Sequence, residues 1–228
     1  MIDHLICDCD GVLVDSEVIA DHVMHSTLSA MYPDLSFDAI VKTAFGQKTA
    51  RFLESVEAAF GITLPVDFVK TVDRQVEAEL ARSLSAIAGV RDALHRVPLP
   101  AAVVSNSRLA RVTTSLERTG LTELFAPRIF SAEQAARPKP FPDVYLFAAQ
   151  QLGVDPARCL VIEDSMSGLN AARAAGMKTI AFVGASHIPD GYADVLRKMG
   201  ITRIMQHMSE LPALVEAGMR GEFGDVQS

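Results

Sequence analysis

The chain has 228 residues, 49% of them hydrophobic, which is enough for one large domain or for one domain that carries an insert. Its 21 basic and 28 acidic side chains give a formal net charge of −7, which disfavours long-range attraction to nucleic acid or to an anionic membrane. We therefore expect neither a nucleic acid nor a membrane as a partner. A local basic pocket could still bind a small anion.

Three cysteines, Cys7, Cys9 and Cys159, lie in or beside apolar runs. Their odd number and spacing argue against a secreted disulfide protein. Cys7 and Cys9 could form half of a metal site, but the sequence has no second Cys or His pair at a matching spacing. The first residues lack the pattern of a signal peptide, and no apolar run approaches the ~18 residues of a membrane span. We expect a cytoplasmic protein.

The first predicted strand covers residues 2–7 and ends at an acidic turn. From 16 to 84 the apolar residues recur at helical spacing, which predicts four or five helices and no strand. After Gly89 strands and helices alternate. The expected strands are 101–104, 128–130, 160–162, 179–183 and one near Ile204, and the expected helices are 109–118, 144–152, 167–175 and 209–217.

This alternation predicts an α/β fold with a doubly wound, Rossmann-like parallel sheet and helices on both faces. The helical block follows the first strand directly. We therefore assign residues 1–14 and 86–228 to the α/β core and residues 15–85 to an inserted helical cap domain. Because ligands of such sheets bind at the carboxyl ends of the strands, an insert at that edge is expected to act as a lid.

Polar residues follow the predicted strands at four places, and a parallel sheet would bring all four to one edge. Each place alone has an ordinary explanation as a turn, a helix cap or an exposed loop. Their occurrence in this order, each after a strand, argues against coincidence. The residues are Asp8 and Asp10 after 2–7, Ser105 and Asn106 after 101–104, Lys139 in the loop after 128–130, and Glu163 and Asp164 after 160–162.

The carboxylates at this edge would repel one another and retain protons at neutral pH without compensation. Mg²⁺ would resolve the conflict, because it prefers carboxylates, water and phosphate oxygens. Lys139 adds a positive charge, Ser105 and Asn106 offer neutral donors, and Gly11 permits a tight turn whose N–H groups can face an anion. The edge is therefore suited to Mg²⁺ and a phosphoryl group.

These segments resemble the four motifs of the haloacid dehalogenase superfamily. The segments that carry this resemblance are DCDGVLVDS from Asp8, the strand end at Ser105, the Lys139-Pro140 pair and EDSMSGLNAARAAG from Glu163. The helical insert is similar to the cap that this family carries after its first motif. The first motif, GITL at 61–64 and the C-terminal SELPAL are similar to a sugar-phosphatase branch that includes bacterial 6-phosphogluconate phosphatases.

The resemblance implies a Mg²⁺-dependent phosphatase that hydrolyses a small phosphorylated metabolite, such as a sugar phosphate, through an aspartyl phosphate on Asp8. Asp10 would protonate the leaving oxygen and later deprotonate the attacking water. The implied Mg²⁺ ligands are the side chains of Asp8 and Asp164, the backbone carbonyl of Asp10, and Glu163 directly or through water, and the implied phosphate-binding residues are Ser105, Asn106 and Lys139.

The stretch 42–51 is similar to the substrate loop of the family's cap. The residues implied to contact substrate are Phe45, Gly46, Lys48 and Arg51. With Lys42, the basic members could face an anionic or polyhydroxylated leaving group, or could form a solvated helix face. The late histidines, His187 and His207, have no ligand partners at metal-binding spacing and are interpreted as structural.

Two alternative functions stay open. A β-phosphoglucomutase-type phosphomutase shares the motifs and the cap, but that branch has a His where this chain has Ala20, and His22 does not align cleanly. This difference favours hydrolysis. A non-catalytic binding protein on the same fold would be expected to have lost a motif residue, and none is lost. Asp10 argues against dehalogenase and phosphonatase chemistry. The sequence does not indicate the oligomeric state.

Overall fold

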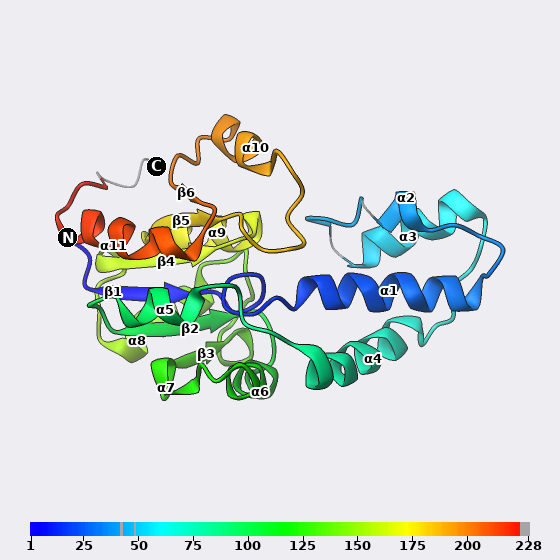
Figure 1. Ribbon diagram of the computed structural model, residues 1–228, viewed down its shortest axis with the longest axis horizontal. Coiled ribbons are helices and arrows are strands. Elements are labelled where there is room, and N and C mark those ends of the chain that lie inside the picture. Colours follow the sequence, from blue (N-terminus) through cyan, green and yellow to red (C-terminus); the bar gives the residue numbers. More distant parts are fainter. Residues whose placement is uncertain (42, 48, 224–228) are drawn as a thin grey trace. The chain divides into compact units, whose positions relative to one another are not determined.

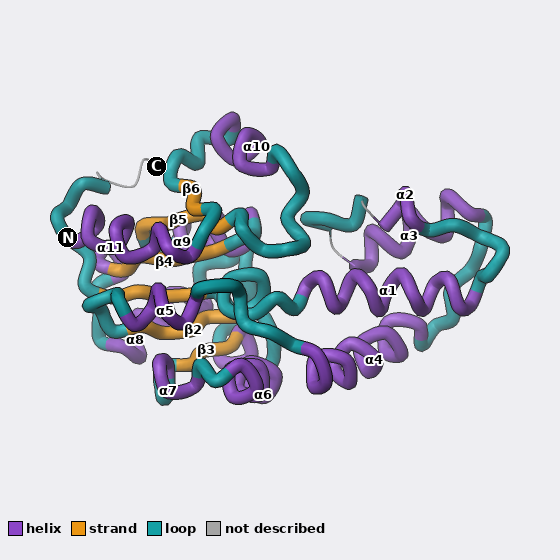
Figure 2. Tube along the Cα trace, in the orientation of Figure 1, coloured by secondary structure: helices purple, strands orange, loops and turns teal. Residues whose placement is uncertain are grey.

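The computed structural model describes residues 1–41, 43–47 and 49–223. The chain forms two compact units, Met1–Asp15 with Ser85–Ser228, and Ser16–Leu84. The first unit contains a six-stranded parallel sheet, and the second is helical in its described residues (Figures 1 and 2). The predicted α/β fold with a helical insert is confirmed. That the insert acts as a lid stays a prediction.

The sheet has the strand order β3-β2-β1-β4-β5-β6. The chain fills one side of β1 first and then crosses to the other side, so the order reverses between β1 and β4. Such a reversal is where open α/β sheets bind their ligands. The strands are β1 (His4–Cys7), β2 (Ala101–Ser105), β3 (Ile129–Ser131), β4 (Cys159–Glu163), β5 (Lys178–Phe182) and β6 (Ile204–Met205).

The central strands are apolar along their length because helices cover both faces of the sheet. Ile6, Val104 and Val161 lie on one face and pack against α8 (Asp143–Leu152) and α9 (Met166–Ala174). The helices α5 (Val90–His95) and α11 (Leu211–Met219) contact each other and cover the opposite face (Figure 1). This burial on both faces fixes the strand ends, and with them the polar residues that follow.

The short helices α5, α7 (Thr122–Phe125) and α10 (Tyr192–Lys198) are not predicted by the sequence pattern. The helices α5, α7 and α10 each span too few residues to show a repeated apolar stripe. The predicted helix 209–217 begins instead as a 3₁₀ turn, Met208–Glu210, before α11. The remaining elements of this unit are α6 (Leu109–Thr119), α7 (Thr122–Phe125), α10 (Tyr192–Lys198) and two further 3₁₀ turns, Ala132–Gln134 and Pro156–Arg158.

The helical unit has its own apolar core. One face of α4 is buried at every fourth residue, with Phe68, Val72 and Val76 facing inward. Val69, on the same helix, lies off this stripe and is 43% exposed. The helices are α1 (Glu17–Met31), α2 (Asp38–Val41), α3 (Thr49–Phe60) and α4 (Phe68–Ser83). Among the described residues, no helix has the length and apolar character to cross a membrane.

The chain leaves and re-enters the α/β unit through two segments that pair with each other. The N–H of Asp15 donates to the carbonyl of Ser85 at 3.0 Å, and the N–H of Ile87 donates to the carbonyl of Leu13 at 2.9 Å. The two segments that flank the helical insertion are therefore hydrogen-bonded to each other within the α/β unit.

Candidate active site

The turn after β1 holds Asp8 at the carboxyl edge of the sheet. The N–H of Asp8 donates to the carbonyl of Ile162 at 3.0 Å, which extends the pairing of β1 with β4 by one residue. Gly11 then adopts φ +75°, and its N–H donates to the carbonyl of Val14 at 2.9 Å. A Cβ at Gly11 would overlap the carboxylate of Asp164. The glycine thus allows this turn to lie directly against the end of β4.

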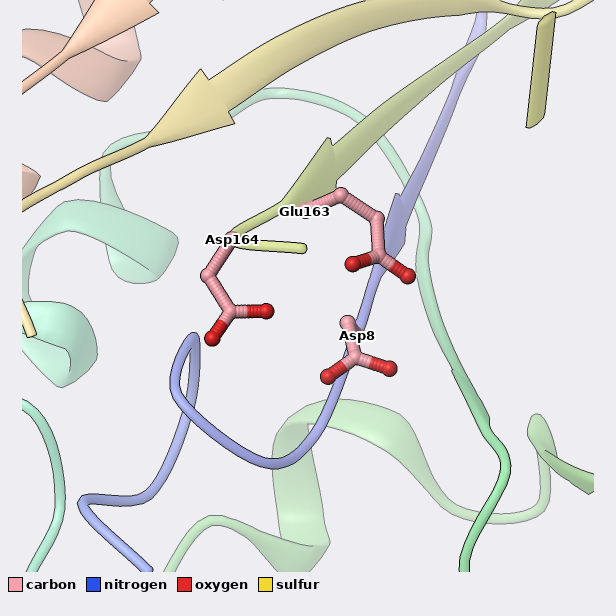
Figure 3. A group of neighbouring side chains, drawn as sticks. All are labelled: Asp8, Glu163 and Asp164. Atoms are coloured by element: carbon pink, nitrogen blue, oxygen red, sulfur yellow. The ribbon is translucent and has the colours of Figure 1, made fainter. Parts of the chain in front are cut away.

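Three buried carboxylates meet at the reversal of the strand order. Asp8 follows β1, Glu163 ends β4, and Asp164 follows it; one oxygen from each lies within 4.8 Å of the others. Figure 3 shows the three carboxyl groups arranged around a common space. An all-oxygen, buried set of this kind could hold a divalent metal ion.

Lys139 supplies the opposite charge inside this cluster. Its side chain is 3% exposed, and its ammonium group donates to Asp8 Oδ1, to Glu163 Oε1 at 2.6 Å and to the carbonyl of Val104 at 2.9 Å. The Lys139 loop is held by Asn106, whose Oδ1 accepts from the Lys139 N–H at 2.9 Å and whose Nδ2 donates to the Lys139 carbonyl at 3.3 Å. Asn106 therefore positions the lysine.

Burial and mutual repulsion set the protonation of the cluster. Burial raises the pKa of Asp8 well above its usual range; Lys139 opposes this shift, while Glu163 and Asp164 add to it. Burial alone would lower the pKa of Lys139, but the carboxylates of Asp8 and Glu163 outweigh it and raise that pKa. Lys139 is thus held in its charged form by its carboxylate neighbours.

Glu163 is fixed by neighbours on three sides. Besides Lys139, its Oε1 accepts from the Tyr145 hydroxyl at 2.8 Å, and its Oε2 accepts from the Ser165 hydroxyl at 3.0 Å. Ser165 also caps α9 by accepting from the N–H of Gly168 at 3.0 Å. Ser165 therefore links the first turn of α9 to the Glu163 carboxylate.

We expect Gly168→Ala to disturb the packing of α9 against Glu163, to destabilise the protein and to lower activity. An alanine Cβ would overlap the Glu163 carboxylate, and this overpacking should cost about 1–3 kcal/mol in the free energy of unfolding, beyond the modest gain in helix propensity. Chemical denaturation measures the loss. Asn170→Ala, exposed on the same helix, is the matched control and should change stability by less than about 0.5 kcal/mol. Equal stability of the two variants would contradict the prediction.

Asp10 lies beside the polar end of β2. Its Oδ2 accepts from the Ser107 hydroxyl at 2.7 Å and from the Ser105 hydroxyl at 3.4 Å, and Arg111 approaches its Oδ1 to 3.7 Å. The Ser105 hydroxyl in turn accepts from the N–H of Ser107 at 2.9 Å. The aspartate is thus held by side chains from the strand end and from α6.

Asp164 contacts His187, a residue whose sequence context predicts only a structural role. The Nε2 atom of His187, in the loop after β5, lies 3.2 Å from Asp164 Oδ2. No sequence pattern predicts this contact, because it arises only when the ends of β4 and β5 are paired side by side. The side chains of Ser107, Arg111, Tyr145 and Ser165 were likewise left out of the predicted site.

The predicted substrate residues lie in the helical unit. Phe45 is half-buried and Gly46 is exposed, in the connection between α2 and α3, and Gly46 has φ +73°. Arg51 is exposed in the first turn of α3. Lys42 and Lys48 lie outside the described residues. The role of these residues therefore stays a prediction. The seven predicted site residues of the α/β unit, by contrast, do lie together at the carboxyl edge of the sheet.

The pattern of the haloacid dehalogenase-like hydrolases matches residues 5–182 of the chain. The chain belongs to this family. A relative of this hydrolase, 6-phosphogluconate phosphatase of Escherichia coli K12, is 29% identical over 217 residues, which cover 95% of this chain and 96% of the relative.

Solved structures agree with this assignment. A haloacid dehalogenase-like protein of unknown function from Agrobacterium tumefaciens is 38% identical, with a TM-score of 0.88 over 96% of this hydrolase and 100% of that chain. A family hydrolase from Deinococcus radiodurans with bound phosphate and sodium is 36% identical, with a TM-score of 0.81 over 96% and 97% of the two chains. The predicted family and the predicted enzyme class, a phosphatase hydrolase, are confirmed.

Proposed function

We propose that this hydrolase is a Mg²⁺-dependent phosphatase that releases phosphate from a small phosphorylated metabolite through an aspartyl phosphate on Asp8. The observation that carries the proposal is the buried cluster of Asp8, Glu163 and Asp164 with Lys139 in its midst, at the reversal of the strand order. We place the enzyme in the cytoplasm on the basis of its sequence.

The donor set fits Mg²⁺. Asp8, Glu163 and Asp164 offer only oxygen ligands, and the raised pKa of Asp8 reflects burial and crowded negative charge that a dication would relieve. We infer that the side chains of Asp8 and Asp164 and the backbone carbonyl of Asp10 hold the ion, with Glu163 binding directly or through water. When bound, the ion supplies positive charge for the phosphoryl oxygens and for an ionised Asp8.

In the first step, a carboxylate oxygen of Asp8 attacks phosphorus while the bond from phosphorus to the leaving oxygen breaks. Asp10 gives its proton to that oxygen, so the product leaves as an alcohol. The ammonium group of Lys139 and the hydroxyl of Ser105 bind the phosphoryl oxygens, with Asn106 holding the lysine loop in place. Positioning and charge compensation therefore account for most of the catalysis.

In the second step, water attacks the phosphorus of the aspartyl phosphate. Asp10, now ionised, takes a proton from this water, and the bond between phosphorus and the Asp8 oxygen breaks. Inorganic phosphate is released and the Asp8 carboxylate is regenerated. The hydrogen bond from Ser107 holds Asp10 beside the strand end, where one carboxyl group can serve in both steps.

We infer a sugar phosphate as the substrate class. The support is the full-length similarity to a 6-phosphogluconate phosphatase. We propose that Phe45, Gly46, Lys48 and Arg51 of the helical unit contact the leaving group, whose hydroxyl or acidic groups would suit basic side chains.

The test is phosphate release by the purified full chain from hexose phosphates, 6-phosphogluconate, phosphoglycolate and nucleotides, with Mg²⁺ or with EDTA. We expect release with Mg²⁺, loss of release with EDTA, and recovery when excess Mg²⁺ is returned. Conversion of β-glucose 1-phosphate to glucose 6-phosphate without free phosphate would instead identify a phosphomutase. No turnover of any ester, with Mg²⁺ present, would favour a non-catalytic binding protein.

A further inference from the structure

We propose that His187 is a positioning residue for Asp164, and that it strengthens Mg²⁺ binding by holding this carboxylate in place. This inference rests on the proposed function. It concerns the loop after β5, which contributes none of the predicted metal ligands or phosphate-binding residues.

The contact between the two side chains is close and shielded. His187 Nε2 lies 3.2 Å from Asp164 Oδ2, and the side chains are 9% and 8% exposed. A carboxylate only accepts hydrogen bonds, so the imidazole nitrogen is the donor. Figure 3 shows the Asp164 carboxyl group facing the space that it shares with Asp8 and Glu163.

Gly11 forms the wall against which both side chains pack. A Cβ at this position would overlap the Asp164 carboxylate and would come within 2.9 Å of His187 Cε1. The imidazole and the carboxylate therefore occupy the room that the missing side chain leaves. Neither group can turn far without meeting the backbone of the first-motif turn, so the pair is geometrically restrained.

The loop that carries His187 is tied to the sheet and to the first motif by hydrogen bonds just before the histidine. The preceding residue, Ser186, donates through its hydroxyl to Asp15 Oδ2, which ties the loop to the end of the first motif. The N–H of Val183 donates to the carbonyl of Met205 at 2.9 Å, and the N–H of Ile188 donates to that of Ala185 at 3.1 Å. The histidine is thus presented by a fixed loop, as expected of a residue that orients another.

The geometry favours a role for His187 in positioning Asp164 over a role as a direct metal ligand. Mg²⁺ prefers oxygen ligands, and the Nε2 atom is already engaged with Asp164. Hydrogen-bond partners of metal ligands typically change metal affinity about 10- to 100-fold when they are removed. A carboxylate free to rotate would have to be ordered at each binding event, which would weaken binding.

The test is a MgCl₂ titration of the full chain without substrate, read as the rise in unfolding temperature, on wild type, His187→Leu and His187→Gln. We expect His187→Leu to raise the Mg²⁺ dissociation constant about tenfold or more. His187→Gln, which keeps an N–H donor, should recover part of the affinity. In phosphate-release assays, the Mg²⁺ concentration for half-maximal rate should rise, while kcat at saturating Mg²⁺ falls less. His95→Leu, exposed on α5, is the control and should bind Mg²⁺ like wild type.

Folded His187→Leu with a Mg²⁺ dissociation constant within about twofold of wild type would overturn the role of His187 and leave the proposed function standing. Should His187→Leu fail to fold, His187→Ala, which also lacks a donor, decides by the same criterion. Wild-type protein that binds no Mg²⁺ would overturn the proposed function and this inference with it.

Discussion

Asp8→Asn is expected to lower kcat by about 10⁴-fold or more, because the amide that replaces the carboxylate is not a nucleophile. The two side chains have nearly the same shape, and Lys139 keeps its contact with Glu163 at 2.6 Å, so the variant should stay folded. Phosphate release from the best substrate measures the loss. Mass spectrometry of acid-quenched wild type should find a phosphoryl group on the Asp8 peptide, and this group should be missing from the variant.

The matched control is Asp3→Asn, the same substitution before β1, where Asp3 pairs with His4 at 2.9 Å and with Arg158 outside the cluster. It should retain wild-type turnover. Asp8→Asn that keeps more than about a tenth of wild-type kcat would exclude Asp8 as the nucleophile.

Lys139→Met is expected to damage both stability and activity. Methionine fills a similar volume but leaves Asp8 and Glu163 buried without their ammonium partner, which should cost about 3–5 kcal/mol in the free energy of unfolding. The phosphoryl oxygens would also lose a fixed positive charge, with an expected loss of about 10²- to 10³-fold in kcat. Denaturant unfolding in EDTA isolates the first effect, and phosphate release on the folded variant measures the second.

Lys198→Met, exposed on α10, is the control for the loss of a lysine and should change stability by less than about 0.5 kcal/mol. A Lys139→Met protein as stable as this control would show that the carboxylates of Asp8 and Glu163 do not depend on the lysine. Full activity in a folded Lys139→Met protein would remove Lys139 from the phosphate site.

The residues at the strand ends could be predicted because two local signals coincide. A short apolar run that is buried on both faces identifies a strand, and the polar residue after it must lie at the carboxyl edge. Asp8 follows β1, and Ser105 and Glu163 are the last residues of β2 and β4, so all three lie at this edge. Parallel pairing then brings these residues together, since the N–H of Asp8 is hydrogen-bonded to β4 itself.

Contacts that helices and loops make with the residues at the strand ends could not be predicted in this way. Tyr145 reaches Glu163 from α8, and His187 reaches Asp164 from the loop after β5. Neither contact leaves a periodic pattern, because it depends on strand order and on the path of a loop. Asn106 shows a related limit. Its position after β2 was visible, but its double hydrogen bond to the backbone of Lys139 is a tertiary feature.

The pairing of Asp15 with Ser85 and of Leu13 with Ile87 makes the helical unit an exchangeable module. The two segments that lead into and out of it are hydrogen-bonded to each other within the α/β unit, so a different insert could be joined there without changing the strand register. If the insert contacts the leaving group and the α/β unit carries the phosphate chemistry, as proposed above, exchanging the insert at this point would change substrate selection and leave that chemistry intact. A chimaera carrying the insert of a relative is therefore a route to new substrate ranges on an unchanged catalytic scaffold.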